Sequence, residues 1–221
     1  MNVTVLERSN RSLELEGQSV IRVLLVHDAC LLRMALAEQL AREPDLEVFH
    51  APWSHARGRY RSVRPDLCVV DLDDEATYAH APLGDLTGPS AVGRGCRVLV
   101  LATANRPGQL RRAAEADALG YVNKASAPDR LLAGIRQVAA GQRFVDDSLG
   151  FGFLKAAQMP LTRRELSVLS LAAGGASVAE IANSLHLSHG TVRNYMAAIT
   201  RKTGARNRID AIRISQGEGW V

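Results

Sequence analysis

Three polar side chains and one alanine near the carboxyl end of the chain lie at the spacing of one helical face. Arg193, Ala197 and Arg201 lie at positions i, i+4 and i+8, and Asn194 follows the first of them. Arginine can donate to both acceptors on the edge of a guanine, and asparagine can pair with both edge groups of an adenine. These residue types suit the reading of base edges in a major groove. We expect Arg193 and Asn194 to read bases, with Ala197 beside them.

Hydroxyl and cationic side chains lie near the two ends of the same predicted helix. Ser188 and Thr191 are at its start, and Arg201, Lys202 and Arg206 are near or after its end. Hydroxyls, cations and helix-terminal N–H groups are common partners of DNA phosphates. We expect these five residues to contact the DNA backbone.

An acidic segment offers a different chemistry. Asp71-Leu72-Asp73 follows an apolar run and resembles the first motif of haloacid-dehalogenase-type phosphatases, in which one aspartate is the nucleophile and the second is the acid. That motif normally lies on the first strand and continues with Thr or Val, whereas here it follows a later apolar run and continues to Glu75. Residues 93–95 (Gly-Arg-Gly) precede a predicted strand and lack the third glycine of a nucleotide loop, so they predict a turn. We therefore expect that the chain is not an enzyme.

The three cysteines indicate neither a disulfide framework nor a zinc site. Cys30, Cys68 and Cys96 are odd in number and widely spaced, whereas such sites need paired or closely spaced cysteines. We expect all three to be reduced and buried, and we expect no resident metal or other cofactor.

Composition and charge describe a folded protein with a basic carboxyl-terminal part. The 221 residues are 47% hydrophobic and 23% charged, which is ordinary for a globular protein. The start lacks a secretory signal and no stretch is apolar for long enough to span a bilayer, so we expect a cytoplasmic protein. Residues 151–221 hold nine Lys and Arg against four Asp and Glu, and the net charge of the whole chain is +4. A basic domain of this kind suits a polyanion such as DNA.

Residues 20–141 show the alternation of a doubly wound α/β domain with a parallel sheet, after an extension over residues 1–19. Near-continuous apolar runs of strand length are typical of parallel strands buried on both faces, and stretches with apolar residues at i, i+3, i+4 and i+7 are typical of the helices between them. Proline and glycine are frequent in residues 77–95, so the helix expected there should be short or replaced by a loop. The predicted strands are 20–26, 46–49, 67–72, 98–101 and 120–122, and the predicted helices are 31–40, 109–119 and 129–139.

The rest of the chain predicts an all-α domain. Residues 142–158 have the composition of a linker with one short helix, and residues 159–221 should hold four helices. Thr162 and Ser177 are each followed three residues later by a glutamate, which is the pattern of a capping box. Ser188 should cap a third helix, 190–203, and a fourth helix should cover about 208–216. The tight turn between the second and third helices predicts a helix-turn-helix at about 178–197.

These carboxyl-terminal residues resemble the LuxR-type DNA-binding domain of NarL/FixJ-type response regulators. The resemblance covers nearly all of residues 160–217 and implies sequence-specific binding of double-stranded DNA. It is carried by Leu161-Thr162-x-Arg164-Glu165, Val168-Leu169, Ala172-x-Gly174, Glu180-Ile181-Ala182, Leu185-x-Leu187-Ser188, Thr191-Val192 and Arg206-x-Arg208.

The α/β domain resembles the receiver domain of the same regulators. In that family an acidic pair and an acceptor aspartate hold Mg²⁺, a hydroxyl and a lysine contact the phosphoryl group, and an aromatic residue acts as a switch. The resemblance implies that Asp71 is the acceptor, Lys124 the lysine and Tyr121 the aromatic residue. The acidic pair is replaced by His27-Asp28 and the hydroxyl by Ala102.

These departures predict a receiver that works without phosphorylation. Mg²⁺ prefers oxygen ligands, so an imidazole at position 27 should leave at most weak binding at Asp28 and Asp71. Three alternatives stay open: a receiver switched by phosphorylation with Mg²⁺, a receiver that senses a small ligand, and a receiver that only binds other proteins. The degenerate pocket also resembles that of WhiI-type orphan regulators of actinobacterial sporulation, which would imply control of developmental genes.

Assembly follows from the size of the DNA-binding domain. One helix-turn-helix buries a small interface on DNA, so useful affinity should require a dimer on two half-sites, either a homodimer or a heterodimer with a related regulator. In the resembling family the last helix pairs across the dyad. Ile209, Ile212 and Ser215 lie at i, i+3 and i+6 in that helix and are the expected dimer contacts.

Overall fold

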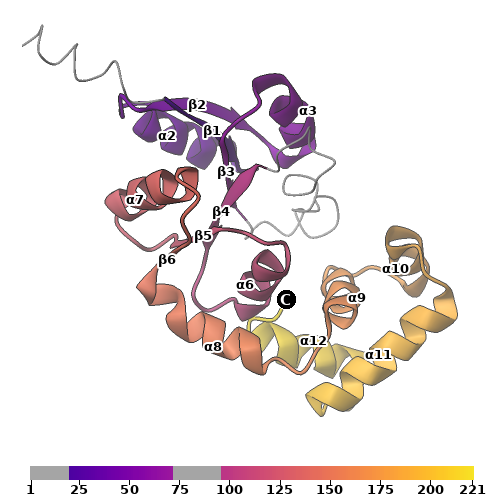
Figure 1. Ribbon diagram of the computed structural model, residues 1–221. Coiled ribbons are helices and arrows are strands. Elements are labelled where there is room, and N and C mark those ends of the chain that lie inside the picture. Colours follow the sequence, from indigo (N-terminus) through magenta and orange to yellow (C-terminus); the bar gives the residue numbers. More distant parts are fainter. Residues whose placement is uncertain (1–19, 72–95) are drawn as a thin grey trace, which may run out of the picture.

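A six-stranded parallel sheet forms the centre of the amino-terminal part of the protein in the computed structural model, which describes residues 20–71 and 96–221 (Figure 1). The strand order is β2-β1-β3-β4-β5-β6, and every neighbouring pair is parallel. The strands are almost wholly apolar because helices cover both faces of the sheet. Their bounds are β1 (Ile21–Val26), β2 (Leu46–Ala51), β3 (Leu67–Asp71), β4 (Arg97–Ala102), β5 (Gly120–Asn123) and β6 (Phe144–Val145).

Two apolar cores lie between the sheet and its helices, one on each face of the sheet. Successive residues of a strand point to opposite faces, and Leu24 and Leu25 of β1 accordingly lie in different cores. One core packs under α2 and α7, and the other packs under α3, α6 and α8 (Figure 1). The helices of this part are α2 (Cys30–Leu40), α3 (Trp53–Val63), α6 (Pro107–Glu115) and α7 (Pro128–Ala139).

The doubly wound architecture predicted from the sequence is confirmed, but three elements differ in detail. Helix α3 was missed because its buried residues, Ala56, Tyr60 and Val63, include only one aliphatic side chain larger than alanine. The segment predicted as a linker begins with β6 and a 3₁₀ turn, Asp147–Leu149. Its first residues therefore add a strand to the sheet before the chain continues to α8. Helix α6 ends at Glu115 and not at residue 119, because Asp117 adopts a positive φ of 56°. The loop expected over residues 77–95 lies outside the described residues.

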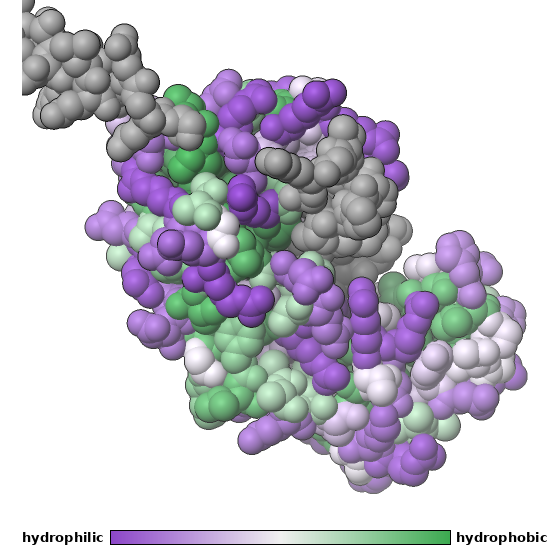
Figure 2. Space-filling view, viewed as in Figure 1, coloured by the Kyte–Doolittle hydropathy of each residue, from purple (hydrophilic) through white to green (hydrophobic). Residues whose placement is uncertain are grey.

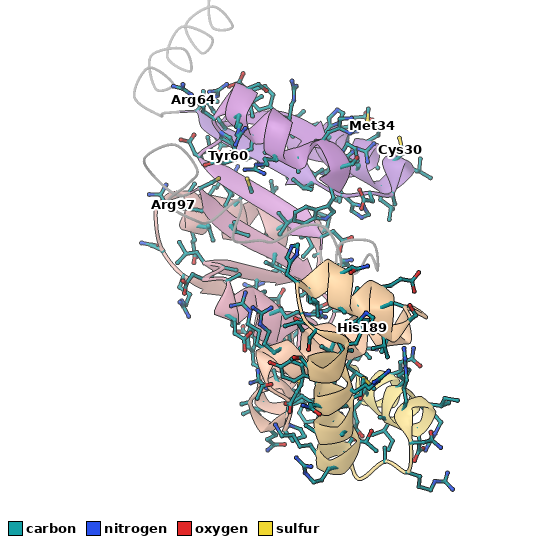
Figure 3. All side chains as sticks on the ribbon, turned by 90° about the vertical axis from the view of Figure 1, so that its right-hand side faces the viewer. Cys30, Met34, Tyr60, Arg64, Arg97 and His189 are labelled. Atoms are coloured by element: carbon teal, nitrogen blue, oxygen red, sulfur yellow. The ribbon has the colours of Figure 1, made fainter. Side chains whose placement is uncertain are left out.

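Only two of the three cysteines are buried as expected. The sulfur atoms of Cys68 and Cys96 lie 3.3 Å apart inside the sheet layer as thiols. Cys30, in contrast, is exposed at the start of α2, where Figure 3 shows it near Met34 on the outer side of the helix. The expectation of burial is wrong for Cys30, because it lies in the first turn of α2, where residues 30–32 are all exposed.

The carboxyl-terminal part is helical, in agreement with the sequence. Thr162 and Ser177 each form the predicted capping box with the glutamate three residues later. His186 adopts a left-handed conformation with φ 53°, which turns the chain sharply between α10 and α11. Four of the helices pack around one apolar core, while α8 leads into them. The bounds are α8 (Gly150–Gln158), α9 (Arg163–Ala173), α10 (Val178–Leu185), α11 (His189–Thr203) and α12 (Arg208–Gly217).

The helical part docks on α6 of the sheet domain, and the carboxyl terminus lies beside this helix (Figure 1). The amide of Gly108 donates to the carbonyl of Gly219 at 3.2 Å. The guanidinium of Arg112 donates to the hydroxyl of Ser170, and that of Arg111 donates to the carbonyl of Met159, both at 3.1 Å. A Cβ at position 108 would collide with the carbonyl of Trp220, so the glycine permits this close approach.

Helix α8 crosses the lower edge of the sheet domain and presents apolar side chains to solvent. Phe151 and Leu154 are exposed on it, and Figure 2 shows hydrophobic residues gathered over this helix. Among the residues that the structure describes, no helix is both long and apolar enough to cross a membrane.

Candidate DNA-reading helix and receiver site

Helix α11 is fixed at both ends and along one face by local sequence. The hydroxyl of Ser188 accepts the amide of Thr191 at 3.0 Å at its start, and Gly204, with φ 68°, ends it. Val192, Met196 and Ile199 are buried in the helical core. This stripe determines which side of α11 faces outward.

The outward face carries the side chains that the sequence predicts for base reading. Arg193, Asn194, Ala197 and Arg201 are all exposed, and α11 lies on the side of the helical part that is remote from the sheet (Figure 1). Within the described part of the chain, no hydrogen bond or ion pair engages the guanidinium of Arg193 or that of Arg201. The face therefore presents two cations and an amide at the spacing that a major groove accepts.

The residues expected at phosphates divide into two groups. Ser188 is exposed and Thr191 half-buried at the start of α11, with their hydroxyl oxygens 2.8 Å apart. Arg206 is exposed although its Nε lies 3.4 Å from the carboxylate of Asp210. Lys202 differs, because its Nζ pairs with Glu165 Oε2 at 2.7 Å and so joins α11 to the capping box of α9.

The pKa of Glu165 shows how tightly this capping box is held. Burial alone would raise the pKa of the carboxyl, but the hydrogen bonds from Lys202 and from Thr162 outweigh it, and the pKa lies below its usual value. Lys202 therefore holds α11 to the start of α9, a role that its position in the sequence did not predict.

The three residues expected at a dimer contact do not share one exposed face. Ile209 is 79% exposed, whereas Ser215 is 0% exposed. Ile212 packs partly against the helical core. The expectation is therefore wrong for Ser215, which is buried where the carboxyl-terminal residues fold back: its carbonyl accepts the amide of Trp220 at 2.8 Å.

In the sheet domain, the topology gathers the predicted receiver residues at one edge. Asp71 ends β3, His27 follows β1 and Lys124 follows β5. All three lie at the carboxyl ends of parallel strands, near the point where the strand order reverses between β1 and β3. This is where ligands bind in open α/β sheets.

The carboxylate of Asp71 has a protein partner on each oxygen. His27 Nε2 lies 2.9 Å from Oδ2, and the ammonium of Lys124 pairs with Oδ1. His27 Nδ1 accepts the amide of Ala29 at 3.0 Å, so Nδ1 carries no proton and the proton of a neutral imidazole lies on Nε2. Among the described residues, the imidazole of His27 and the ammonium of Lys124 thus both engage the carboxylate of Asp71.

The neighbouring Asp28 is also engaged. Its Oδ1 accepts the amide of Trp53 at 2.8 Å, at the start of α3. The indole of Trp53 donates to the carbonyl of Asp71 at 3.1 Å, and Arg33 donates to the carbonyls of His27 and Asp28. Sequence reasoning missed Trp53 because it missed α3, and it did not predict the contacts of Arg33 with the carbonyls five and six residues earlier.

This donor set does not fit Mg²⁺. The ion needs several oxygen ligands in near-octahedral geometry. His27 offers a nitrogen that already donates to Asp71, and the carboxylate of Asp28 is used to hold α3. An incoming Mg²⁺ would have to displace both interactions.

The two positions that complete the family's switch are buried. Ala102 is 0% exposed and offers only a methyl group where the resemblance implies a hydroxyl. Tyr121 packs edge-on against Phe153 of α8, with ring centroids 5.0 Å apart. Burial raises the pKa of Tyr121 to about 12. The aromatic ring is thus held inward against the linker helix.

Hydrogen bonds also join the loop after β5 to the start of the linker helix. Asn123 donates to the hydroxyl of Ser148 at 2.9 Å, and Ser126 donates to Asp146 at 2.6 Å. Asp146 in turn accepts the amide and hydroxyl of Ser148. Burial acts to raise the pKa of Asp146, but these hydrogen bonds prevail and hold it below its usual value.

Comparisons with known proteins agree with both parts of the molecule. Residues 159–215 match the family model of bacterial regulatory proteins of the luxR family. The response regulator RamR of Streptomyces coelicolor is 47% identical over 210 residues, which is 91% of this chain and 98% of that protein. The transcriptional regulatory protein DesR of Bacillus subtilis is 34% identical over 203 residues, 91% of this chain and 99% of that protein.

Solved structures share the fold. The response regulator RcsB of Salmonella typhimurium superposes with a TM-score of 0.70 at 20% identity, covering 90% of this chain and 98% of that one. The response regulator ChrA of a heme-sensing two-component system gives a TM-score of 0.53 at 24% identity, covering 92% and 100%. From the matched DNA-binding domain and the two full-length relatives, the chain belongs to the NarL/FixJ-type response regulators, DNA-binding transcriptional regulators with a LuxR-type helix-turn-helix.

Proposed function

We propose that this protein regulates transcription as a dimer on paired DNA half-sites, with a receiver that needs neither phosphorylation nor Mg²⁺. The observation that carries the proposal is the pairing of both carboxylate oxygens of Asp71, one with His27 and one with Lys124. In this atypical receiver the protein's own groups engage both oxygens of Asp71, and His27 stands where the resemblance implies an acidic metal ligand.

The physical argument concerns the nucleophile. Phosphorylation requires a carboxylate oxygen of Asp71 to attack phosphorus while a metal neutralises the charge that builds up. Here Oδ2 of Asp71 accepts a hydrogen bond from Nε2 of His27, and Oδ1 is paired with the ammonium of Lys124. Attack would break one of these buried interactions, and the absence of a hydroxyl at Ala102 removes a further contact to the transferred group. The unphosphorylated form of Asp71 is therefore favoured over the phosphorylated form.

DNA binding is proposed to involve Arg193 and Asn194 at bases and the exposed residues at the ends of α11 at phosphates. A single recognition helix buries little surface, so two copies bound side by side supply the affinity. A structure of RcsB, which shares the fold, contains two dimers bound to DNA, and this supports a dimeric arrangement. Ile209 is the apolar residue of α12 that remains available for the contact.

The partner is a second copy of the chain or a related response regulator. Control of developmental genes, which the resemblance to sporulation regulators implies, is part of the proposal and rests on that resemblance alone. We place the protein in the cytoplasm, where its DNA lies.

The test is DNA binding measured with and without a phosphoryl mimic. An operator is first selected from random duplexes, and fluorescence anisotropy then gives the affinity of the full chain for a paired and for a single half-site. We expect a dimer on the paired site by sedimentation, with an unchanged dissociation constant when beryllofluoride and Mg²⁺ are added. Ile209→Asp should weaken paired-site binding, whereas Leu154→Asp, on exposed α8, should not.

Two results would overturn the proposal in different parts. A 1:1 complex on a single half-site, as tight as on the paired site, would refute the dimer. Tenfold or greater tightening by beryllofluoride and Mg²⁺, lost in Asp71→Asn, would show a receiver switched in the ordinary way.

A further inference from the structure

A cavity opens between α2 and α7, on the face of the sheet opposite α3 and α6. Its volume is about 370 Å³, which lies within the range of small-molecule sites in proteins. Leu32 and Leu36 come from α2 and Leu131 and Leu132 from α7, so the two helices form its walls. Figure 1 shows these helices on the same side of the sheet.

The floor and the inner end of the cavity differ in polarity. Leu101 of β4 and Val122 of β5 form an apolar floor. His27, Asp71 and Lys124 lie at the end next to the carboxyl ends of the strands, which we call the inner end because His27 and Asp71 are buried there. The cavity is therefore an apolar slot that ends on polar side chains already paired with one another.

We propose that this cavity binds a small, uncharged and mainly apolar molecule that carries one polar group at its inner end. The leucine walls favour an apolar body, because burying apolar surface is the main source of affinity in such a slot. A charged head group is disfavoured, because it would have to compete with an existing partner of Asp71 or Lys124. The proposal does not depend on DNA binding, but it rests on the same pairing of Asp71 with His27 and Lys124 as the phosphorylation-independence proposed above.

The exposure of Lys124 at the inner end of the cavity explains why one end of the ligand must be polar. Lys124 has an exposed side-chain fraction of 29%, and Asp71 has only 5%. An entirely apolar occupant would cover the ammonium of Lys124 and remove water from it, which costs free energy without a replacement hydrogen bond. A carbonyl or hydroxyl at that end replaces the water.

The experiment uses prodan, an uncharged naphthalene ketone whose fluorescence shifts to the blue in apolar surroundings. The full-length protein is titrated with the dye, and binding is followed by the emission shift. We expect saturable binding of one molecule per chain. The parent dimethylaminonaphthalene, which lacks the ketone, should bind several-fold more weakly.

Two variants fill the cavity and one tests the adjoining surface. Leu36→Trp and Leu132→Trp narrow the slot from opposite walls, and each should weaken prodan binding at least tenfold. Leu31→Trp enlarges an exposed residue of the same helix that does not line the cavity, so it should leave binding unchanged. Thermal melting by circular dichroism checks that all three variants fold, and if one wall variant does not, the other carries the test.

Three outcomes would overturn the proposal. Unsaturable binding, or several dye molecules per chain, would show that the dye binds to the exposed apolar face of α2 and not in the cavity. An equal loss of dye affinity in Leu31→Trp and in the wall variants would lead to the same conclusion. Absence of binding, together with a dimer that Leu31→Trp dissociates, would show that a second copy of the chain covers the cavity.

Discussion

Arg193 carries the sharpest assignment at the scale of single residues. It projects from the outward face of α11 with no intramolecular partner in the described part of the chain, next to Asn194. If its guanidinium contacts a guanine through two hydrogen bonds, Arg193→Ala should reduce discrimination between operator and random duplex by about 1 to 3 kcal/mol. Anisotropy titrations on the two duplexes measure the difference.

Arg164→Ala is the matched control for this prediction. Arg164 is also an exposed arginine of the helical part, but it lies at the start of α9 and away from α11. It should change binding to both duplexes equally or not at all. Equal loss on both duplexes for Arg193→Ala would assign this residue to phosphate binding.

Sequence reasoning could predict residues whose role depends on strand ends or on one helix, and it failed where packing between elements decides. Asp71 and Lys124 lie together because parallel strands bring their carboxyl ends to one edge, whereas the roles predicted for them stay predictions. Ser215 was misplaced because the docking of the carboxyl terminus, not the period of α12, determines its burial. The pairing of Lys202 with Glu165 joins residues 37 positions apart, which no local pattern can reveal.

At the scale of elements, Glu165 links the start of α9 to α11. It closes the capping box with Thr162 and pairs with Lys202. Glu165→Gln should keep most of the cap but lose the ion pair, and we expect the free energy of unfolding of the helical domain to fall by about 1 to 2 kcal/mol at neutral pH. Urea unfolding followed by circular dichroism measures the change.

The same carboxyl predicts a pH dependence. Its pKa is lower in the folded protein than the ordinary value of 4.5, so its contribution is present above that value and is lost as the pH falls through the folded pKa. Wild type should therefore lose its advantage over Glu165→Gln in acid. Glu180→Gln is the comparison for the lysine pair alone: the hydrogen bonds of its own capping box also lower the pKa of Glu180, but no lysine partner is described for it. Its gap to wild type should therefore be smaller than that of Glu165→Gln. An unchanged gap between wild type and Glu165→Gln at acid pH would contradict the assignment.

Strongly patterned elements were predicted from the sequence, and weakly patterned ones were not. The capping boxes located the starts of α9 and α10, since the residues that form them are local. Helix α3 has Gly58 in its interior, and β6 has only two residues. Both are held by tertiary contacts, α3 by its packing on β2 and β1 and β6 by its pairing with β5.

At the scale of the whole molecule, the two parts are joined by a close backbone contact at α6. Gly108→Ala would place a methyl group against the carbonyl of Trp220. The carboxyl terminus should then leave α6, and the radius of gyration measured by small-angle X-ray scattering should increase. Gly58→Ala is the control, because a methyl group there meets nothing within 4 Å. An unchanged radius for Gly108→Ala would show that this contact does not hold the two parts together.

The central claim is that Asp71 is not phosphorylated. Measurement of the intact mass after incubation with acetyl phosphate and Mg²⁺ tests this claim most directly. Because His27 and Lys124 already occupy the two oxygens of Asp71, we predict that wild type gains no phosphoryl group. The double variant His27→Asp with Ala102→Ser restores the acidic and hydroxyl positions and should gain a phosphoryl group, which confirms that the reagent is active. A stoichiometric gain of one phosphoryl group by wild type, absent in Asp71→Asn, would contradict the account.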